Sequence, residues 1–223
     1  MTSEPDIKWN AVAAFVRQLT HDIRNQLNGL ELEAALIAEA PESAEAAESL
    51  ARIREQLHQI AGSLRSLSSK FANPSPMLSP ITAVELFLIF QEQAAHVENL
   101  PKVDWTHTLQ QEQINVDATE LAIVARELLT NARDFQPGER VEVRGLADGG
   151  SVIFQFHEPK AVSIETATLA GWGSAPFESA RRNRYGLGLW EARRLVEANN
   201  GKITRAYEAQ AKKLLTTLTF PIL

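Results

Sequence analysis

The sequence predicts an α+β fold in which a long antiparallel helical hairpin precedes a two-layer α/β sandwich. Two long segments at the start of the chain carry apolar residues every three or four positions, which is the spacing of one helix face. A proline-rich stretch follows, and beyond it short alternating segments typical of strands are interleaved with helical ones. These observations predict a hairpin at 1–72, a linker at 73–80 and an α/β domain at 81–223.

The first helix is expected from about Trp9 to Ala38, where Pro41 disfavours its continuation. Its apolar stripe consists of Phe15, Leu19, Ile23, Leu27 and Leu30. His21 lies on the opposite side, because each residue turns the helix by about 100°. Asp22 stands beside His21, and Asn25 shares the His21 face one turn further on. A histidine presented in this way to solvent is accessible to another domain or protein.

The second helix is expected to follow Ser43, a residue type that caps helix N-termini. Its apolar positions repeat as a heptad: Leu50, Ile53, Leu57, Ile60, Leu64, Leu67 and Phe71. One hairpin covers each apolar stripe only in part, so we expect a homodimer that forms a four-helix bundle. The alternative is a monomer whose stripes dock on the rest of the chain.

The proline-rich linker precedes an alternation of helices and strands. Asp117 and Glu120 have the spacing of a capping box at the start of one helix. The turn sequence 147–150 joins two strands as a hairpin. In order, we expect a helix at 81–97, a strand at 102–109, a helix from 117, strands at 140–144 and 151–157, a helix from 188 to 199, and a strand pair at 202–207 and 214–220.

Composition narrows the possible functions. The formal charge of −6, without a basic run, argues against nucleic-acid binding. The chain has no cysteine, which excludes disulfides and thiolate metal sites, and its histidines lack metal-ligand spacing. No apolar run reaches the roughly 18 residues that span a bilayer, and the N-terminus lacks a signal-peptide pattern. We therefore expect a soluble, cytoplasmic protein that does not insert into a membrane.

The segment His21-Asp-Ile-Arg-Asn-Gln-Leu27 resembles the phospho-acceptor box of histidine kinases, His-Glu-Leu-Arg-Asn-Pro-Leu. The resemblance implies that His21 becomes phosphohistidine. Asp22 would hydrogen-bond the ring N–H and fix its tautomer, which raises the nucleophilicity of the imidazole. Asn25 would position a water that hydrolyses the phospho-aspartate of a response regulator.

A second segment, Glu127-Leu-Leu-Thr-Asn-Ala-Arg-Asp-Phe135, resembles the N-box of the GHKL-type ATPase domain of that family. The resemblance implies that Asn131 binds the Mg²⁺ that bridges the ATP phosphates, since an amide oxygen suits this hard cation. Glu127 lies one turn earlier on the same face. It would polarise the attacking group or order the water shell of the metal.

A third segment, Tyr185-Gly-Leu-Gly-Leu189, resembles the G2 box of the family, Gly-x-Gly-Leu-Gly-Leu. Gly186 and Gly188 match the family's glycines, which let backbone N–H groups approach phosphate oxygens at a helix N-terminus. Arg184 replaces the first glycine. With two neighbouring arginines, it would either hold phosphates or solubilise a surface segment.

The sequence departs from the family at the G1 box, Asp-x-Gly-x-Gly, whose aspartate accepts a hydrogen bond from adenine. Strand parity places Glu158 at the aspartate, and Lys160 and Val162 at the glycines. Pro159 fixes φ between them, so the turn differs from that of the family. Glu158 remains able to accept the adenine hydrogen bond through a longer side chain.

The resemblance implies a soluble histidine kinase that uses ATP and Mg²⁺ to phosphorylate His21 and then passes the phosphoryl group to a response-regulator receiver domain. The eroded G1 box leaves an alternative, an ATP-independent histidine phosphotransferase or phosphatase with a pseudo-ATPase domain. A third hypothesis is a non-enzymatic dimeric binding module. The intact triplet of His21, Asp22 and Asn25 argues against this module, because a scaffold does not need such a group.

Overall fold

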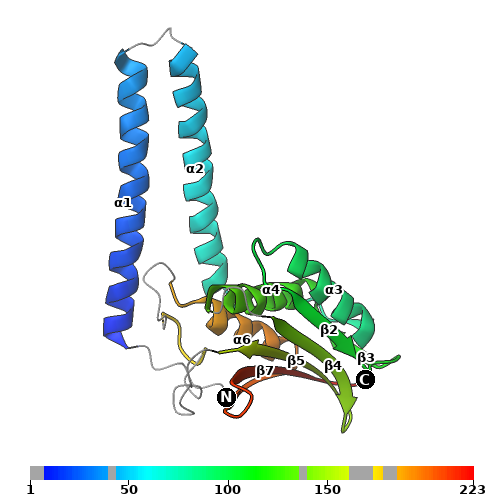
Figure 1. The fold of residues 1–223 in the computed structure, drawn as a ribbon. Helices are drawn as coiled ribbons and strands as arrows, with labels where there is room; N and C mark the ends of the chain where they lie inside the picture. The colour runs from blue at the N-terminus through cyan, green and yellow to red at the C-terminus, as the bar shows by residue number, and fades with distance from the viewer. Residues whose placement is uncertain (1–7, 40–43, 136–139, 161–172, 178–184) are drawn as a thin grey trace. The chain divides into compact units, whose positions relative to one another are not determined.

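The computed structural model describes residues 8–39, 44–135, 140–160, 173–177 and 185–223 (Figure 1). The chain divides into two compact units. One unit combines Asp6–Asn73 with Phe177–Tyr185, and the other is built from Pro74–Pro176 and Gly186–Leu223. The fold class is α+β, as predicted. Residues 40–43, where the sequence predicts the end of the first helix and the cap of the second, lie outside the described part of the chain.

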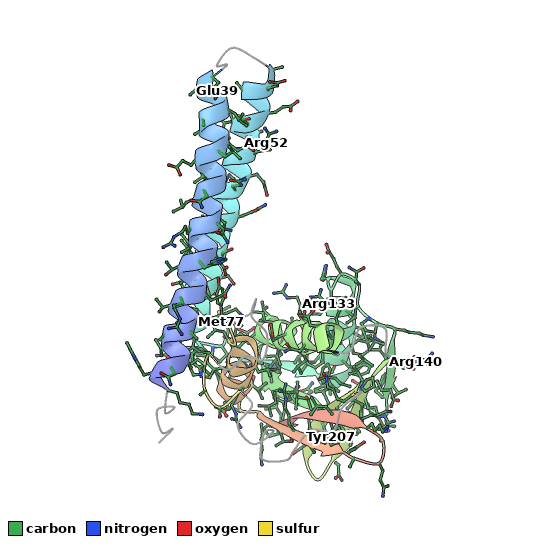
Figure 2. All side chains as sticks on the ribbon, turned by 60° about the vertical axis from the view of Figure 1, so that its left-hand side comes forward. Glu39, Arg52, Met77, Arg133, Arg140 and Tyr207 are labelled. Carbon is green, nitrogen blue, oxygen red and sulfur yellow. The ribbon has the colours of Figure 1, made fainter. Side chains whose placement is uncertain are left out.

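Two long helices form the first unit. Helix α1 spans Trp9–Glu39 and helix α2 spans Ala44–Phe71. Arg52 of α2 joins them by donating two hydrogen bonds to the Glu33 carboxylate of α1, at 2.8 and 3.0 Å (Figure 2). Helix α1 is described over its whole length and has no buried residue in this single chain. The apolar stripes that the sequence predicts are therefore only partly covered.

A five-stranded sheet forms one layer of the second unit, in the order β2-β4-β5-β7-β6. Strands β2 and β4 are parallel, and the other neighbours are antiparallel. Gly149 and Gly150 connect β4 to β5 with φ angles of 55° and 78°, which suits glycine and a tight hairpin turn. The strand bounds are β2 Val103–His107, β4 Val141–Asp148, β5 Ser151–Pro159, β6 Lys202–Glu208 and β7 Lys213–Pro221.

Three of the described helices pack on one face of this sheet (Figure 1). They are α3 Ala83–Ala95, α4 Ala118–Phe135 and α6 Gly188–Ala198. Aromatic rings fill the interface: Phe90 of α3 meets Phe154 of β5 edge-on at a centroid distance of 5.1 Å, and Phe154 meets Phe220 of β7 at 6.3 Å. All three rings are completely buried. This core fixes α4 and α6, which carry Glu127, Asn131 and Gly188, three of the residues predicted to bind nucleotide and metal.

A small second sheet was missed by the sequence prediction. Strand β1, Ser79–Thr82, pairs antiparallel with β3, Gln113–Val116. The prediction that helix begins at 81 is wrong, because Thr82 caps the following helix α3 instead. Its hydroxyl accepts a hydrogen bond from the Glu85 N–H, and the Glu85 carboxylate accepts from the Thr82 N–H.

Helix α4 begins at the predicted N-cap, Asp117, but the full capping box does not form. Asp117 Oδ1 accepts from the Thr119 and Glu120 N–H groups, as an N-cap does. A capping box also needs a hydrogen bond from the Asp117 N–H to the Glu120 side chain. This part of the prediction is wrong, because the Asp117 N–H donates to Asn199 Oδ1 at 2.6 Å. Asn199 Nδ2 donates to Glu120 Oε2 at 2.8 Å. The fully buried Asn199 thus fastens the C-terminus of α6 to the N-terminus of α4.

Candidate functional site

The residues of the predicted acceptor triplet, His21, Asp22 and Asn25, lie together on α1. The His21 side chain is 67% exposed and that of Asp22 is 38% exposed. Asp22 Oδ1 lies 3.4 Å from His21 Nδ1. Asn25 Nδ2 lies 3.3 Å from the same ring nitrogen and 3.5 Å from Nε2. One turn of helix therefore brings an accessible imidazole, a carboxylate and an amide within reach of one another.

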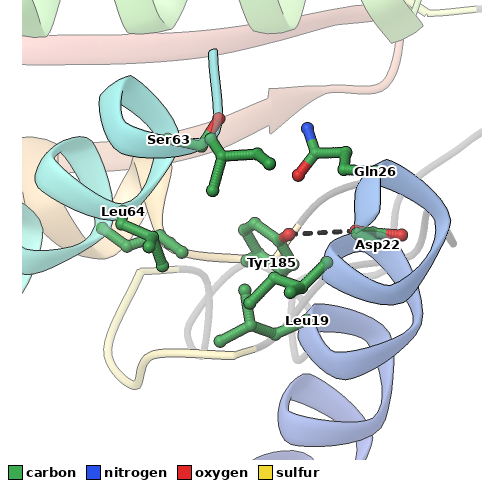
Figure 3. Close-up of a pocket in the computed structure, with 9 residues that line it drawn as sticks. Leu19, Asp22, Gln26, Ser63, Leu64 and Tyr185 are labelled. Carbon is green, nitrogen blue, oxygen red and sulfur yellow. Dashed lines mark hydrogen bonds between the residues drawn. The ribbon is translucent and has the colours of Figure 1, made fainter. Parts of the chain in front are cut away.

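Two further side chains hold Asp22. Gln18 Nε2 donates to Asp22 Oδ1 at 2.8 Å, and the Tyr185 hydroxyl donates to Asp22 Oδ2 at 2.9 Å (Figure 3). The sequence analysis missed both. Gln18 was detectable, because it precedes Asp22 by four residues on one helix. Tyr185 gave no local signal, since 163 positions separate it from Asp22.

The Tyr185 hydroxyl keeps its proton in this position and donates it to Asp22 in a hydrogen bond. Burial raises the pKa of its hydroxyl from 10.0 to about 12, and the hydrogen bond to Asp22 and the Asp22 charge act in the same direction. The tyrosine also helps to line a cavity of about 240 Å³ between α1 and α2 (Figure 3). The other lining residues are Leu19, Asp22, Ile23, Gln26, Ile60, Ser63, Leu64 and Leu67.

The N-box and G2 residues meet in the second unit. Asn131 Nδ2 donates to Glu127 Oε1 at 3.2 Å, one turn apart on α4. Gly188 begins α6, and a Cβ atom at this position would overlap the Glu127 carboxylate. Only glycine therefore allows Glu127 to approach the start of α6. Gly186 precedes it with a φ of 66°. Arg184, predicted to lie near the phosphates, is outside the described residues.

Glu158, the residue predicted to accept a hydrogen bond from adenine, is bound by the protein itself. Lys160 Nζ lies 2.9 Å from Glu158 Oε2, and the side chains of Lys160 and Glu158 are only 10% and 4% exposed. The Lys160 N–H donates to the Lys212 carbonyl, which extends the pairing beyond the end of β5. The backbone pairing with the β7 side of the sheet therefore continues at the position where the G1 box of histidine kinases has a glycine-containing turn.

A second cation, Arg205, interacts with the same carboxylate. Burial lowers the pKa of the Arg205 guanidinium on β6, and the negative charge of Glu158 is the largest effect opposing that shift. Glu127 opposes the shift as well. Arg205 was missed by the sequence analysis, because its strand shows only alternation. The carboxylates of Glu127 and Glu158, which the sequence assigns to the nucleotide site, therefore both interact electrostatically with Arg205.

These residues fit only part of a magnesium–nucleotide complex. The Asn131 amide oxygen and the glycine at 188 suit the metal and phosphates. The residue predicted to recognise the base fits less well, because Glu158 Oε2 is already paired with the buried ammonium group of Lys160. Within the described residues, no three His, Cys, Asp or Glu side chains cluster to hold a metal ion.

Known structures share this architecture, whereas no family model and no curated protein sequence matches the chain. The mycobacterial sensor histidine kinase MprB has 20% identity and a TM-score of 0.55 over 66% of this chain and 98% of that structure. Full-length ShkA in complex with AMPPNP has 19% identity and a TM-score of 0.62 over 92% of this chain, which spans 44% of ShkA.

The chain has the fold of histidine kinases. Histidine kinase ThkA, solved in complex with the response regulator TrrA, adds a TM-score of 0.57 at 14% identity, over 93% of this chain and 61% of that one. The expected α+β fold, with a helical hairpin before an α/β domain, is thereby confirmed. None of the described helices combines the length and apolar character that crossing a bilayer requires.

Proposed function

We propose that this chain is a two-component phosphotransfer protein that carries a phosphoryl group on His21 and exchanges it with the aspartate of a response-regulator receiver domain. The observation that supports the proposal is the accessible His21 ring with Asp22 and Asn25 beside it on one helix face. In the proposed organisation, 1–72 is the dimerisation and acceptor hairpin, 73–80 is the linker and 81–223 is the ATPase-like domain.

The chemistry follows from the two ring nitrogens of His21. When Nδ1 carries the proton and faces Asp22, Nε2 presents its lone pair to solvent. Nε2 attacks the phosphorus of the receiver's aspartyl phosphate in line. The new N–P bond forms as the old O–P bond breaks, and the electron pair leaves with the aspartate carboxylate. Asn25, on the same face, positions water for the hydrolysis of a phosphorylated receiver.

The geometry of the second unit favours a receiver, rather than ATP, as the source of phosphate. The buried Lys160–Glu158 ion pair occupies the carboxylate that would recognise the base, and displacing Lys160 would leave it uncompensated. A histidine kinase remains the second candidate, and a separate observation favours it. Glu127, Asn131 and Gly188 come together as a magnesium and phosphate site requires.

The surface of the hairpin supports a homodimer. Large apolar side chains remain 43–65% exposed along both helices: Val16, Leu27, Leu32, Leu36, Leu50, Leu57 and Leu64. On α2, Leu50, Leu57 and Leu64 are seven residues apart and form one exposed apolar strip, which is typical of an interaction surface. A second copy of the hairpin would cover it in a four-helix bundle. The receiver domain would then contact the outer face, where His21 lies.

The decisive experiment offers His21 two phosphoryl donors. Purified protein receives either radiolabelled ATP with Mg²⁺ or a receiver domain carrying a labelled aspartyl phosphate. We expect acid-labile, base-stable label from the receiver, lost in His21→Gln and retained in the control His58→Gln, another exposed helical histidine. Label from ATP would establish the kinase instead. Absence of label from both donors would refute phosphotransfer and leave the binding module.

Nucleotide binding is measured separately by thermal shift. A ligand at 100 times its Kd stabilises the folded state by about 2.7 kcal/mol. We expect no such rise in melting temperature with millimolar ATP and Mg²⁺, because Lys160 occupies the Glu158 carboxylate. A clear rise would show that the base position opens to nucleotide.

A further inference from the structure

We propose that Tyr185 is a positioning residue for His21, acting through the Asp22 carboxylate. This inference rests on the proposed role of His21 as the phosphoryl acceptor. Tyr185 belongs to the same compact unit as the hairpin, although it lies far away in sequence. It thereby supplies an interaction that helix α1 cannot make from its own residues.

Both oxygens of Asp22 have a donor. Oδ2 accepts from the Tyr185 hydroxyl at 2.9 Å and Oδ1 accepts from Gln18 Nε2 at 2.8 Å. Oδ1 is also the oxygen that faces His21 Nδ1 at 3.4 Å. An aspartate with one donor rotates about its last torsion, whereas donors on both oxygens fix the carboxylate plane. Fixing that plane keeps Oδ1 directed at the histidine ring.

An aromatic cluster holds the Tyr185 ring in place. The ring meets Phe15 of α1 edge-on at a centroid distance of 5.3 Å. Phe15 also packs on Phe71 at the end of α2, at 6.2 Å, and on Phe177 at 4.6 Å. Phe177 has a φ of 69°, which is unfavourable for a bulky residue and persists only where packing compensates for it. The cluster thus anchors the donor of the Asp22 hydrogen bond.

Positioning of Asp22 selects the reactive nitrogen of His21. Asp22 stabilises the tautomer with the proton on Nδ1, which leaves Nε2 unprotonated. The competing arrangement has Asn25 Nδ2 donating to Nδ1, which moves the proton to Nε2. Loss of the Tyr185 hydrogen bond loosens Asp22 and shifts the balance towards this second arrangement. The chemical consequence is a slower reaction and a changed site of phosphorylation on the ring.

The test uses phosphoramidate, a small phosphoryl donor that needs no partner protein. Nε2 of His21 attacks phosphorus, the P–N bond of phosphoramidate breaks, ammonia leaves with the bonding electron pair, and the Nδ1 proton stays on the ring. The variant Tyr185→Phe removes only the hydroxyl and keeps the aromatic packing. The matched control is Tyr207→Phe, since these are the chain's two tyrosines. Phosphorus NMR of the full chain identifies which nitrogen is phosphorylated.

We expect Tyr185→Phe to slow phosphorylation of His21 about threefold to tenfold, less than the full effect of losing a hydrogen bond to a carboxylate, because Tyr185 acts on His21 only through Asp22. Nδ1-phosphohistidine should appear beside the Nε2 product, and Tyr207→Phe should match the wild type. Nitrogen NMR of the unphosphorylated ring should show the same change of tautomer. An unchanged rate and product in Tyr185→Phe would overturn the inference, because a purely structural tyrosine leaves both unaffected.

A titration of tyrosinate absorbance tests the contact without any phosphorylation. In Tyr207→Phe the remaining tyrosine should ionise near pH 12, and adding Asp22→Asn should lower its pKa towards 10.0. Ionisation near pH 10.0 in Tyr207→Phe would overturn the inference at its first step. If the titration shows the contact but wild-type His21 accepts no phosphate from any donor, the proposed function fails and the positioning role fails with it.

Discussion

Replacing Lys160 with methionine should destabilise the α/β domain by about 3 kcal/mol, because removing one partner of a buried ion pair costs about 3–5 kcal/mol. The two charged atoms lie 2.9 Å apart, and the Glu158 side chain is 4% exposed. Without the ammonium group this carboxylate stays buried and keeps only the more distant charge of Arg205. The lower end of the range applies because the Lys160 side chain keeps a 10% exposed edge.

Urea unfolding and calorimetry measure this change. A loss of about 3 kcal/mol corresponds to a fall of roughly 6–12 °C in the melting temperature of a domain of this size. Glu158→Gln alone should also destabilise, whereas combining it with Lys160→Met should cost much less than the sum of the two. The difference from additivity is the coupling energy of the pair, which we expect to exceed about 1.5 kcal/mol.

An exposed ion pair of the same sheet provides the control. Arg140 Nη1 lies 2.6 Å from Asp104 Oδ2, with side chains 58% and 32% exposed (Figure 2). Its loss in Arg140→Met should cost less than about 1 kcal/mol, as for other surface pairs. The reasoning would be refuted if Lys160→Met cost no more than Arg140→Met, or if the Lys160 and Glu158 changes were additive. Either result would mean that Lys160 does not hold the Glu158 carboxylate.

The remaining predictions concern three other places in the fold. Leu57→Glu puts a charge into the exposed apolar strip of α2, so the variant should sediment as a monomer and the wild type as a dimer. A wild-type protein that is monomeric at micromolar concentration would contradict this. Gly188→Ala puts a methyl group where the Glu127 carboxylate lies, so this flexible side chain should turn away from α6 and the melting temperature should fall by no more than a few degrees. A larger fall would mean that Glu127 is held rigidly in place. Burial lowers the pKa of His157 below its ordinary 6.5, and the charge of Arg144 adds to this, so the unfolded state binds the proton more readily. Stability should therefore fall as the pH drops below 6.5, and should fall less in His157→Gln.

The sequence predicts the hairpin well because its signals are local. Continuous apolar periodicity placed the first helix at Trp9–Ala38, and the structure ends it one residue later, at Glu39. His21 and Asn25 come together for the same reason, since one helical turn relates them. Glu127 and Asn131 repeat this relation on α4. Residues on one helix keep their mutual geometry whatever the rest of the chain does.

Features that depend on distant pairing were not predictable in this way. Strands β1 and β3 have four residues each, too few to show alternation, and each exists because the other pairs with it. The buried Asn199 accepts the hydrogen bond from the Asp117 N–H that the capping box assigned to Glu120, and it lies 82 residues from Asp117. Tyr185 reaches Asp22 across 163 residues. A single sequence contains no signal for contacts of this kind.

The Lys160–Glu158 ion pair was only partly predictable from the sequence. Residues two apart on a strand share a face, so the pairing was available from strand parity once β5 was known to run to Pro159. A glycine at 160 would leave the Glu158 carboxylate free for a ligand, whereas lysine supplies its own cation. Tyr185 lies at the variable position of the segment that resembles the G2 box, and its hydroxyl binds Asp22 next to His21. Residues from two nucleotide-box segments thus make protein contacts in this chain, and one of these contacts lies beside His21. This arrangement is consistent with a protein whose histidine exchanges phosphate with another protein rather than with a bound nucleotide.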